Sequence, residues 1–143
     1  MIVGTGVDLA EIDRVERAIS GPHGERFRAR VFTEGERSWC DARGHGRAES
    51  YAARFAAKEA VMKALGVGWG PRAGWVEIEV VRERGAAPRL ALSGRALRTA
   101  RGLGVERLHL SLSHAGGLAA AFVVAEGPGP PRAGGLTRES NSP

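Results

Sequence analysis

The sequence predicts an α+β fold, in which a short antiparallel sheet packs against a long central helix and shorter helices. Helical periodicity runs through YAARFAAKEAVMKALG at residues 51–66, and apolar and polar residues alternate along residues 107–113, as in a strand. With 143 residues the chain has the length of one domain, and a hydrophobic fraction of 43% is enough to bury a core.

The first segment, MIVGTGVDL at residues 1–9, predicts a strand whose glycines allow another backbone to approach closely. Residues 9–19 have the spacing of an amphipathic helix. Asp8 stands where the strand gives way to the helix, and two compatible interpretations of it stay open. With Glu11 three residues later it fits a helix N-cap, and a carboxylate at the rim of a sheet is also well placed to hold a metal ion.

Residues 20–47 are predicted to form short helices separated by loops. SGPHG at residues 20–24 ends the first helix, and residues 25–32 then have an apolar side and a basic side. Thr33 followed by Glu36 is a capping-box pattern, which predicts a short helix through Trp39. A loop, RGHGR, leads from there into the long helix, which we expect to begin near residue 48.

The long helix carries charges on its apolar side. Lys58 falls in the middle of the apolar stripe, so its ammonium must reach solvent or find a partner. Glu59 and Lys63 lie four residues apart beside the stripe, on a strip otherwise lined by Ala52 and Ala56. The small alanines leave room for a bulky charged ligand, such as phosphate with a divalent cation. The alternative is a core helix on which Glu59 and Lys63 form an ordinary ion pair, which stabilises a helix by roughly a few tenths of a kcal/mol.

The second half of the chain predicts two hairpins around a short helix. The glycine-rich stretch after the long helix lacks the lysine and hydroxyl of a phosphate-binding P-loop, so we interpret it as a flexible connection. The expected elements are a hairpin of strands at 75–82 and 89–93, a helix at 94–104 that Ser93 begins, and a hairpin of strands at 107–113 and 118–126. The second hairpin should turn at His114, where a histidine is most often exposed and idle.

Composition limits the class of protein and its compartment. Residues 1–126 form the predicted domain, whereas residues 127–143, rich in Gly and Pro, predict a disordered tail. The net charge of +5 comes largely from arginine and favours an anionic partner. A single cysteine, Cys40, excludes an internal disulfide, and the sequence shows neither a signal peptide nor a membrane span. We therefore expect a cytoplasmic protein without a membrane partner.

Three separated motifs together resemble one family. They are GTGVDLAEIDR at 4–14, ARFAAKEAVMKALG at 53–66 and HLSLSHAGGLAAAFVVAE at 109–126. In order and spacing they are similar to the holo-acyl-carrier-protein synthases, the small bacterial 4'-phosphopantetheinyl transferases. The resemblance implies the 4'-phosphopantetheinyl transferase fold. It also implies transfer of the phosphopantetheine arm of coenzyme A to a serine hydroxyl of acyl carrier protein, with release of adenosine 3',5'-bisphosphate.

The resemblance implies a role for several residues. Asp8 and Glu59 would bind Mg²⁺, a hard cation that takes oxygen ligands. Glu59 would accept the serine proton, directly or through a water on the cation, and Lys63 would neutralise charge on the leaving phosphate. The residues implied to contact coenzyme A are Arg54, Lys58 and His114, and those implied to contact the acidic carrier protein are Arg14, Arg17, Arg26 and Arg28.

Family members of this size are homotrimers with an active site at each subunit interface, so the resemblance also implies a homotrimer. The competing interpretation is a basic module that binds nucleic acid. Aromatic residues are only 6% of the chain and do not interleave with the arginines, so we expect no nucleic-acid partner. An inactive structural relative is a third interpretation, against which the intact Asp8, Glu59 and Lys63 argue.

Overall fold

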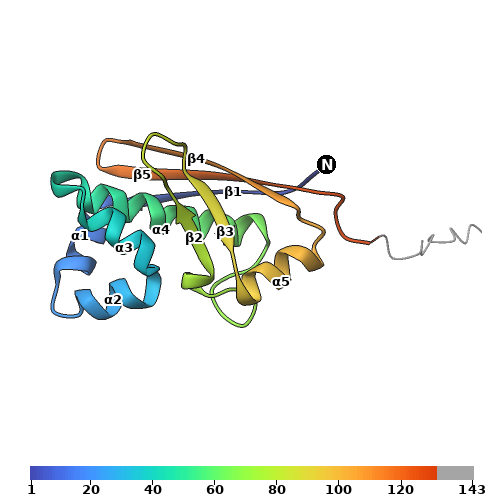
Figure 1. Cartoon of the computed structure of the whole chain (residues 1–143), viewed down its shortest axis with the longest axis horizontal. Helices are drawn as coiled ribbons and strands as arrows, with labels where there is room; N and C mark the ends of the chain where they lie inside the picture. Colours follow the sequence, from blue (N-terminus) through green and yellow to red (C-terminus); the bar gives the residue numbers. More distant parts are fainter. Residues whose placement is uncertain (132–143) are drawn as a thin grey trace, which may run out of the picture.

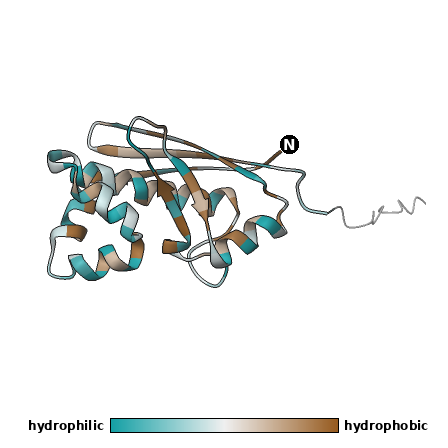
Figure 2. Cartoon of the chain, in the orientation of Figure 1, coloured by the Kyte–Doolittle hydropathy of each residue, from teal (hydrophilic) through white to brown (hydrophobic). Residues whose placement is uncertain are grey.

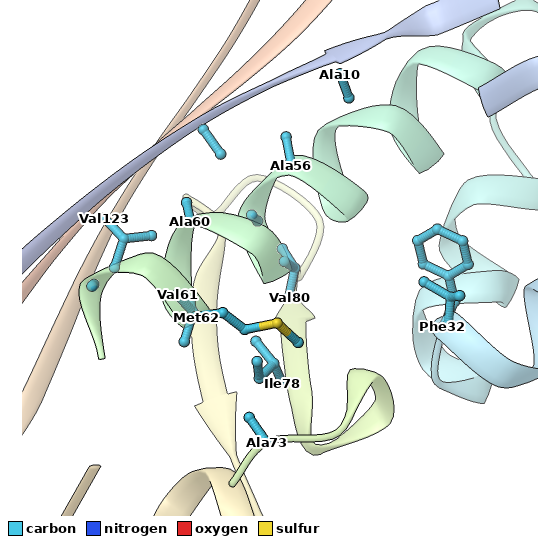
Figure 3. Packing of buried hydrophobic residues seen from close by; sticks show 14 of the residues in the cluster. Ala10, Phe32, Ala56, Ala60, Val61, Met62, Ala73, Ile78, Val80 and Val123 are labelled. Atoms are coloured by element: carbon cyan, nitrogen blue, oxygen red, sulfur yellow. The ribbon is translucent and has the colours of Figure 1, made fainter. Parts of the chain in front are cut away.

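Helix α4 is the longest helix and lies between the main sheet and a hairpin of two further strands (Figures 1 and 3). A computed structural model describes residues 1–131, and its main sheet has three antiparallel strands in the order β1–β5–β4. The elements are β1 (Ile2–Glu11), α1 (Ile12–Ser20), α2 (Gly24–Val31), α3 (Glu34–Asp41), η1 (Gly44–Gly46), α4 (Arg47–Ala64), η2 (Trp75–Glu77), β2 (Ile78–Val81), β3 (Arg89–Leu92), α5 (Gly94–Gly102), β4 (Arg107–Ala115) and β5 (Leu118–Glu126). The predicted α+β class is confirmed.

The core lies on both sides of α4. Val61 and Met62 point from the helix toward Ile78 and Val80 of β2, as Figure 3 shows, and all four side chains are buried. The small residues of α4 face the main sheet instead. In Figure 2 hydrophobic and hydrophilic residues alternate along α2, α3 and α5, as expected for helices that bury one face and expose the other.

Strand β1 passes very close to α4. A Cβ atom added at Gly4 would overlap the carbonyl oxygen of Ala64, and one added at Gly6 would overlap that of Ala60. Glycine at these two positions therefore lets the strand and the helix touch through their backbones, as the sequence predicted. This contact brings the next inward-facing residue of the strand, Asp8, against the last turns of α4.

The prediction that Asp8 caps a helix is wrong. Strand β1 continues to Glu11, which pairs with Leu118, and Asp8 lies in mid-strand opposite Ala121. Helix α1 begins only at Ile12, and no side chain caps its first turn. Helical spacing alone had assigned residues 9–11 to the helix. They pair with β5 instead, and this pairing satisfies their backbone hydrogen bonds.

Short-range sequence patterns predicted the shorter elements correctly. The capping box of Thr33 and Glu36 is confirmed, with both of its hydrogen bonds present. The hairpin of β2 and β3 is confirmed too, but its first strand is shorter than predicted. The Glu77 carboxylate accepts hydrogen bonds from the backbone nitrogens of Gly74 and Arg95, which holds residues 75–77 in a 3-10 turn.

The hairpin of β4 and β5 is confirmed, whereas its predicted turn at His114 is wrong. His114 is still in β4, opposite Ala119, and the turn is made by Gly116 and Gly117. Both glycines have positive φ, at 58° and 78°, which favours glycine in a tight turn. Because His114 shares the inward-facing side of β4 with Leu112, it faces α4.

The end of the described chain is tied to the fold. The nitrogen of Gly127 donates to the Met1 carbonyl at 3.0 Å, and that of Gly129 donates to the Gly104 carbonyl at 3.2 Å. The ordered chain therefore continues a few residues past the predicted boundary at 126/127. The rest of the predicted tail, residues 132–143, lies outside the described residues. Within residues 1–131 no helix has both the length and the apolar character needed to cross a bilayer.

Candidate active site

Asp8, Glu59 and Lys63 come together where β1 crosses the last turns of α4. The Lys63 Nζ atom donates to Asp8 Oδ1 at 2.9 Å and to the Val7 carbonyl at 2.9 Å. Glu59 precedes Lys63 by one helical turn, so both side chains leave α4 on the same side. The structure thus joins a strand residue and two helix residues that lie about fifty positions apart in sequence, which is the cluster that the family resemblance implied.

Electrostatics within this cluster favour protonation of Glu59. Partial burial raises the pKa of the Glu59 carboxyl, the nearby Asp8 carboxylate raises it further, and Lys63 opposes both effects. The hydrogen bond and charge of Asp8 in turn raise the pKa of the Lys63 ammonium. The pKa of the Glu59 carboxyl is therefore raised above its ordinary value, which suits a group that accepts a proton.

The pair Asp8 and Glu59 fits a divalent cation. Each carboxylate raises the free energy of the other when both are charged, and a cation between them would relieve that repulsion. Within residues 1–131 there is no group of three or more His, Cys, Asp or Glu side chains placed to hold a metal. Two carboxylates with the remaining ligands from water and phosphate oxygens is a donor set typical of Mg²⁺ and unlike that of zinc.

A second cluster lines a cleft of about 490 Å³ at the other end of α4. His114 Nδ1 lies 2.6 Å from Glu49 Oε1 at its wall. The other residues around the cleft are Trp39, Arg43, Gly46, Ser50, Ala53, Arg54, Arg82, Leu112 and Ser113. Arg54 and His114, both predicted to contact coenzyme A, are thus brought to one cavity.

Arg54 is buried there with unused hydrogen-bond donors. Its residue is 3% exposed, and Nη1 donates to the carbonyl and hydroxyl oxygens of Ser50 at 3.2 and 2.9 Å. Its Nε and Nη2 atoms are buried without a partner, and burial lowers the pKa of the guanidinium. Its guanidinium carbon lies 5.9 Å from the centre of the Trp39 ring. Arg54 thus places a buried, incompletely hydrogen-bonded cation at the wall of the cleft, where its charge attracts an anionic group.

The sequence did not point to several residues of this cleft. Arg43 and Arg82 lie over the ring of Trp39, at 4.8 and 5.9 Å from its centre, and add positive charge beside Arg54. The Glu49 carboxylate lies beside the His114 ring. These residues come from three separate segments and have no shared spacing, so no local pattern identifies them.

The interpretation of Lys58 as a coenzyme ligand needs correction. Lys58 is 0% exposed, and its Nζ donates to Glu36 Oε1 at 2.6 Å, to the Trp75 carbonyl at 2.9 Å and to the Ile78 carbonyl. All three ammonium donors are used inside the protein. The sequence correctly required a partner for this lysine, but the partner is an internal carboxylate and not a ligand.

The four arginines predicted to meet a carrier protein differ in their surroundings. Arg14 and Arg17 are exposed on α1, and Arg26 is exposed on α2. Arg28 is half-buried, and its Nη1 donates to the Ile19 carbonyl, which links α2 to the end of α1. Arg28 is thus engaged in the contact between the two helices, and the other three remain available on the surface.

The two clusters face different directions from α4. Arg54 and Glu59 are five residues apart, which separates their side chains by roughly 140° around the helix axis. His114 sits beside Glu49, and Glu49 and Glu59 are about 15 Å apart along the axis at ~1.5 Å per residue. One chain therefore presents the carboxylate cluster and the arginine-lined cleft as two separate sites.

Known proteins resemble this chain in sequence and in fold. Residues 4–123 match the family described as the 4'-phosphopantetheinyl transferase superfamily. The holo-[acyl-carrier-protein] synthase of Anaeromyxobacter dehalogenans is 53% identical over 91% of this chain and 100% of its own length. The crystal structure of the Neisseria meningitidis holo-[acyl-carrier-protein] synthase has a TM-score of 0.78 at 30% identity, covering 88% of this chain and 99% of that one. The Helicobacter pylori holo-[acyl-carrier-protein] synthase, solved in complex with coenzyme A, has a TM-score of 0.73 at 29% identity, covering 85% of this chain and 99% of that one.

Proposed function

The chain belongs to the 4'-phosphopantetheinyl transferase superfamily, and we propose that it transfers the 4'-phosphopantetheine group of coenzyme A to a serine hydroxyl of acyl carrier protein. It is an enzyme, a holo-[acyl-carrier-protein] synthase, and adenosine 3',5'-bisphosphate is the second product. The observation that carries the proposal is the contact between Asp8 and the Glu59–Lys63 turn of α4, which assembles two carboxylates and an ammonium at one point.

In this proposal the residues of the first cluster divide the chemistry among them. Glu59 accepts the proton of the serine hydroxyl as its oxygen attacks the phosphorus that bears the pantetheine arm. Burial and the Asp8 carboxylate raise the pKa of Glu59 in the metal-free protein. Lys63, held by Asp8 at 2.9 Å, neutralises charge that develops on the leaving phosphate.

We assign Asp8 and Glu59 as the protein ligands of Mg²⁺. When bound, the cation supplies a positive charge that polarises the diphosphate and orients it for in-line attack. The support for this assignment is the mutual repulsion of the two carboxylates and their hard oxygen donors, described above.

The cleft around Arg54 is our candidate for the nucleotide end of coenzyme A. The free Nε and Nη2 donors of Arg54 suit a phosphate, and Arg43 and Arg82 extend the positive charge of the wall. His114, paired with Glu49, stands at the same wall and is placed to contact the phosphates or the nucleotide.

A homotrimer with interface active sites would bring the two sites together. The outer face of the main sheet, turned away from α4, supports such an assembly because it exposes large apolar residues: Val7 (56%), Leu9 (61%), Leu118 (37%) and Phe122 (46%). A neighbouring copy packed on that face would cover them, and a closed ring of copies would give every carboxylate cluster a partner cleft. The exposed Arg14, Arg17 and Arg26 remain candidates for contact with the carrier protein, and a cytoplasmic location stays a prediction.

The test is the intact mass of an apo acyl carrier protein after incubation with the enzyme, coenzyme A and Mg²⁺. We expect a gain of about 340 Da, the mass of the phosphopantetheine arm in this type of transfer. Excess EDTA should abolish the gain, and further Mg²⁺ should restore it. An unchanged mass with several different carrier proteins would contradict the proposed transfer, and a full gain in EDTA would contradict the assignment of the cation.

A further inference from the structure

Lys58 and Glu36 form a fully buried ion pair that the proposed chemistry does not use. Both side chains are 0% exposed, and Nζ of Lys58 lies 2.6 Å from Oε1 of Glu36. Lys58 directly precedes Glu59 on α4, whereas Glu36 belongs to α3. The pair therefore connects the helix that carries the proposed base to a separate element of the fold.

The pair also connects α4 to the β2 region, since each partner has further hydrogen bonds. Lys58 donates to the carbonyl oxygens of Trp75 in η2 and Ile78 in β2. Glu36 accepts from the Thr33 nitrogen at 3.0 Å and from the Val80 nitrogen at 3.1 Å. Three acceptors from three segments thus converge on one ammonium, and any rotation or slide of α4 would break several of these bonds together.

The described contacts on the opposite side of α4 are weaker. There Lys63 donates to Asp8 and to the Val7 carbonyl, and the contact with β1 at Gly4 and Gly6 is made by backbone and small side chains. Such a smooth contact permits close approach but fixes neither the rotation nor the axial position of the helix. The Lys63 contact with Asp8 is at the surface, and exposed ion pairs hold geometry weakly.

Stability alone does not explain a buried pair of charges at this place. Removing two charges from water is costly, and a buried ion pair is often no more stable than well-packed apolar residues of similar volume. The pair instead specifies one arrangement of α3, α4 and β2, because its directional hydrogen bonds are all satisfied only in that arrangement. Misplacement of a catalytic group by ~1 Å can lower a rate by about a hundredfold, so such an arrangement matters for Glu59.

We propose that Lys58 and Glu36 are positioning residues for the transferase, which fix the rotation and axial position of α4 so that Glu59 and Lys63 face Asp8. The inference rests on the proposed function of that cluster. Neither residue touches the substrates, because both are fully enclosed. Their proposed effect is on the rate of the chemical step, because Glu59 directly follows Lys58, whereas the candidate cleft for coenzyme A lies toward the first turns of α4, around Glu49 and Arg54.

The main test is the double variant Lys58→Met/Glu36→Gln, which removes both charges and keeps the side-chain lengths. We expect a cooperative thermal transition with Tm within about 5 °C of the wild type, a KM for coenzyme A within about threefold, and a kcat lowered at least tenfold. The control is Tyr51→Phe, which removes another α3–α4 link, the 2.8 Å bond from Tyr51 to Asp41, and should leave kcat unchanged. A folded double variant with wild-type kcat, or an equal loss of kcat in Tyr51→Phe, would overturn the inference.

A second variant covers the case in which the double variant does not fold. Glu36→Asp keeps the charge, so that Lys58 stays paired, but shortens the carboxylate arm by one methylene and so pulls the pair toward α3. We expect kcat to fall at least threefold with KM for coenzyme A unchanged, and wild-type kcat in this folded variant would also contradict the inference. Wild-type enzyme that fails to modify any carrier protein would refute the proposed function itself, which distinguishes the two failures.

Discussion

Replacement of Arg54 by methionine should weaken the binding of coenzyme A without destabilising the protein. The guanidinium is buried, and two of its nitrogens, Nε and Nη2, have no partner in the protein. An unpartnered buried donor costs ~1–3 kcal/mol, whereas the two bonds to Ser50 that the variant loses contribute about 1 kcal/mol each. The two effects nearly offset each other. We therefore expect the free energy of unfolding to stay within about 2 kcal/mol of the wild type, or to rise.

The effect on the substrate follows from the same free donors. A hydrogen bond to a charged group contributes about 1.5–3 kcal/mol, which corresponds to a factor of about ten to a hundred in affinity. If Arg54 binds the 3'-phosphate of coenzyme A, its removal should raise KM for coenzyme A by about that factor, with kcat within threefold or so of wild type. Dephospho-coenzyme A lacks that phosphate, so its KM should be nearly the same in the variant and in the wild type.

The assay is steady-state transfer with both coenzymes at saturating carrier protein, together with a thermal melt of each variant. Arg98→Gln, an exposed arginine on α5 that does not line the cleft, is the control for charge alone and should leave both KM values unchanged. An equal rise of KM for coenzyme A and dephospho-coenzyme A would show that Arg54 does not bind the 3'-phosphate. A large loss of stability would show that the free donors are satisfied in solution.

Three further variants test the other parts of the proposed site. Glu59→Gln should abolish turnover while coenzyme A still binds, and near-normal activity with Mg²⁺ present would remove Glu59 from the mechanism. Because the pKa of Glu59 is raised in the folded protein, its charge destabilises the fold above that pKa, and the penalty disappears as the pH falls below the pKa of an ordinary glutamate. Glu59→Gln should therefore melt higher than the wild type at neutral pH, by a margin that shrinks toward pH 4 or so, and a margin that grows in acid would contradict the raised pKa. Arg14→Glu should lower kcat/KM for the carrier protein steeply at low salt and leave coenzyme A binding intact, and unchanged kinetics would exclude Arg14 from the docking surface. Phe122→Glu should dissociate the assembly in sedimentation experiments and abolish transfer together, whereas an active monomer would refute the interface site.

Local chemistry was predictable from the sequence, and long-range pairing was not. Thr33 and Glu36 form the predicted capping box because both partners lie within one turn. The interpretation of Asp8 as a helix cap failed, since the ladder between β1 and β5 depends on residues more than a hundred positions away. The resemblance brought Glu59, Lys63 and Asp8 together, but Glu49 and Arg82, which no shared spacing links to the predicted residues, were missed.

The long helix shows why composition along a stripe cannot assign roles to buried cations. Lys58 and Arg54 are both buried on α4, one helical turn apart, and the family resemblance implied that both contact coenzyme A. The structure separates them by their hydrogen bonds, because Lys58 has a protein acceptor for every donor and Arg54 does not. A satisfied buried cation has no capacity left for a ligand and can only fix its surroundings, whereas an unsatisfied one costs free energy until an anion binds. Lys58 therefore fixes the position of the helix that carries the proposed base, whereas Arg54 is available to bind the substrate.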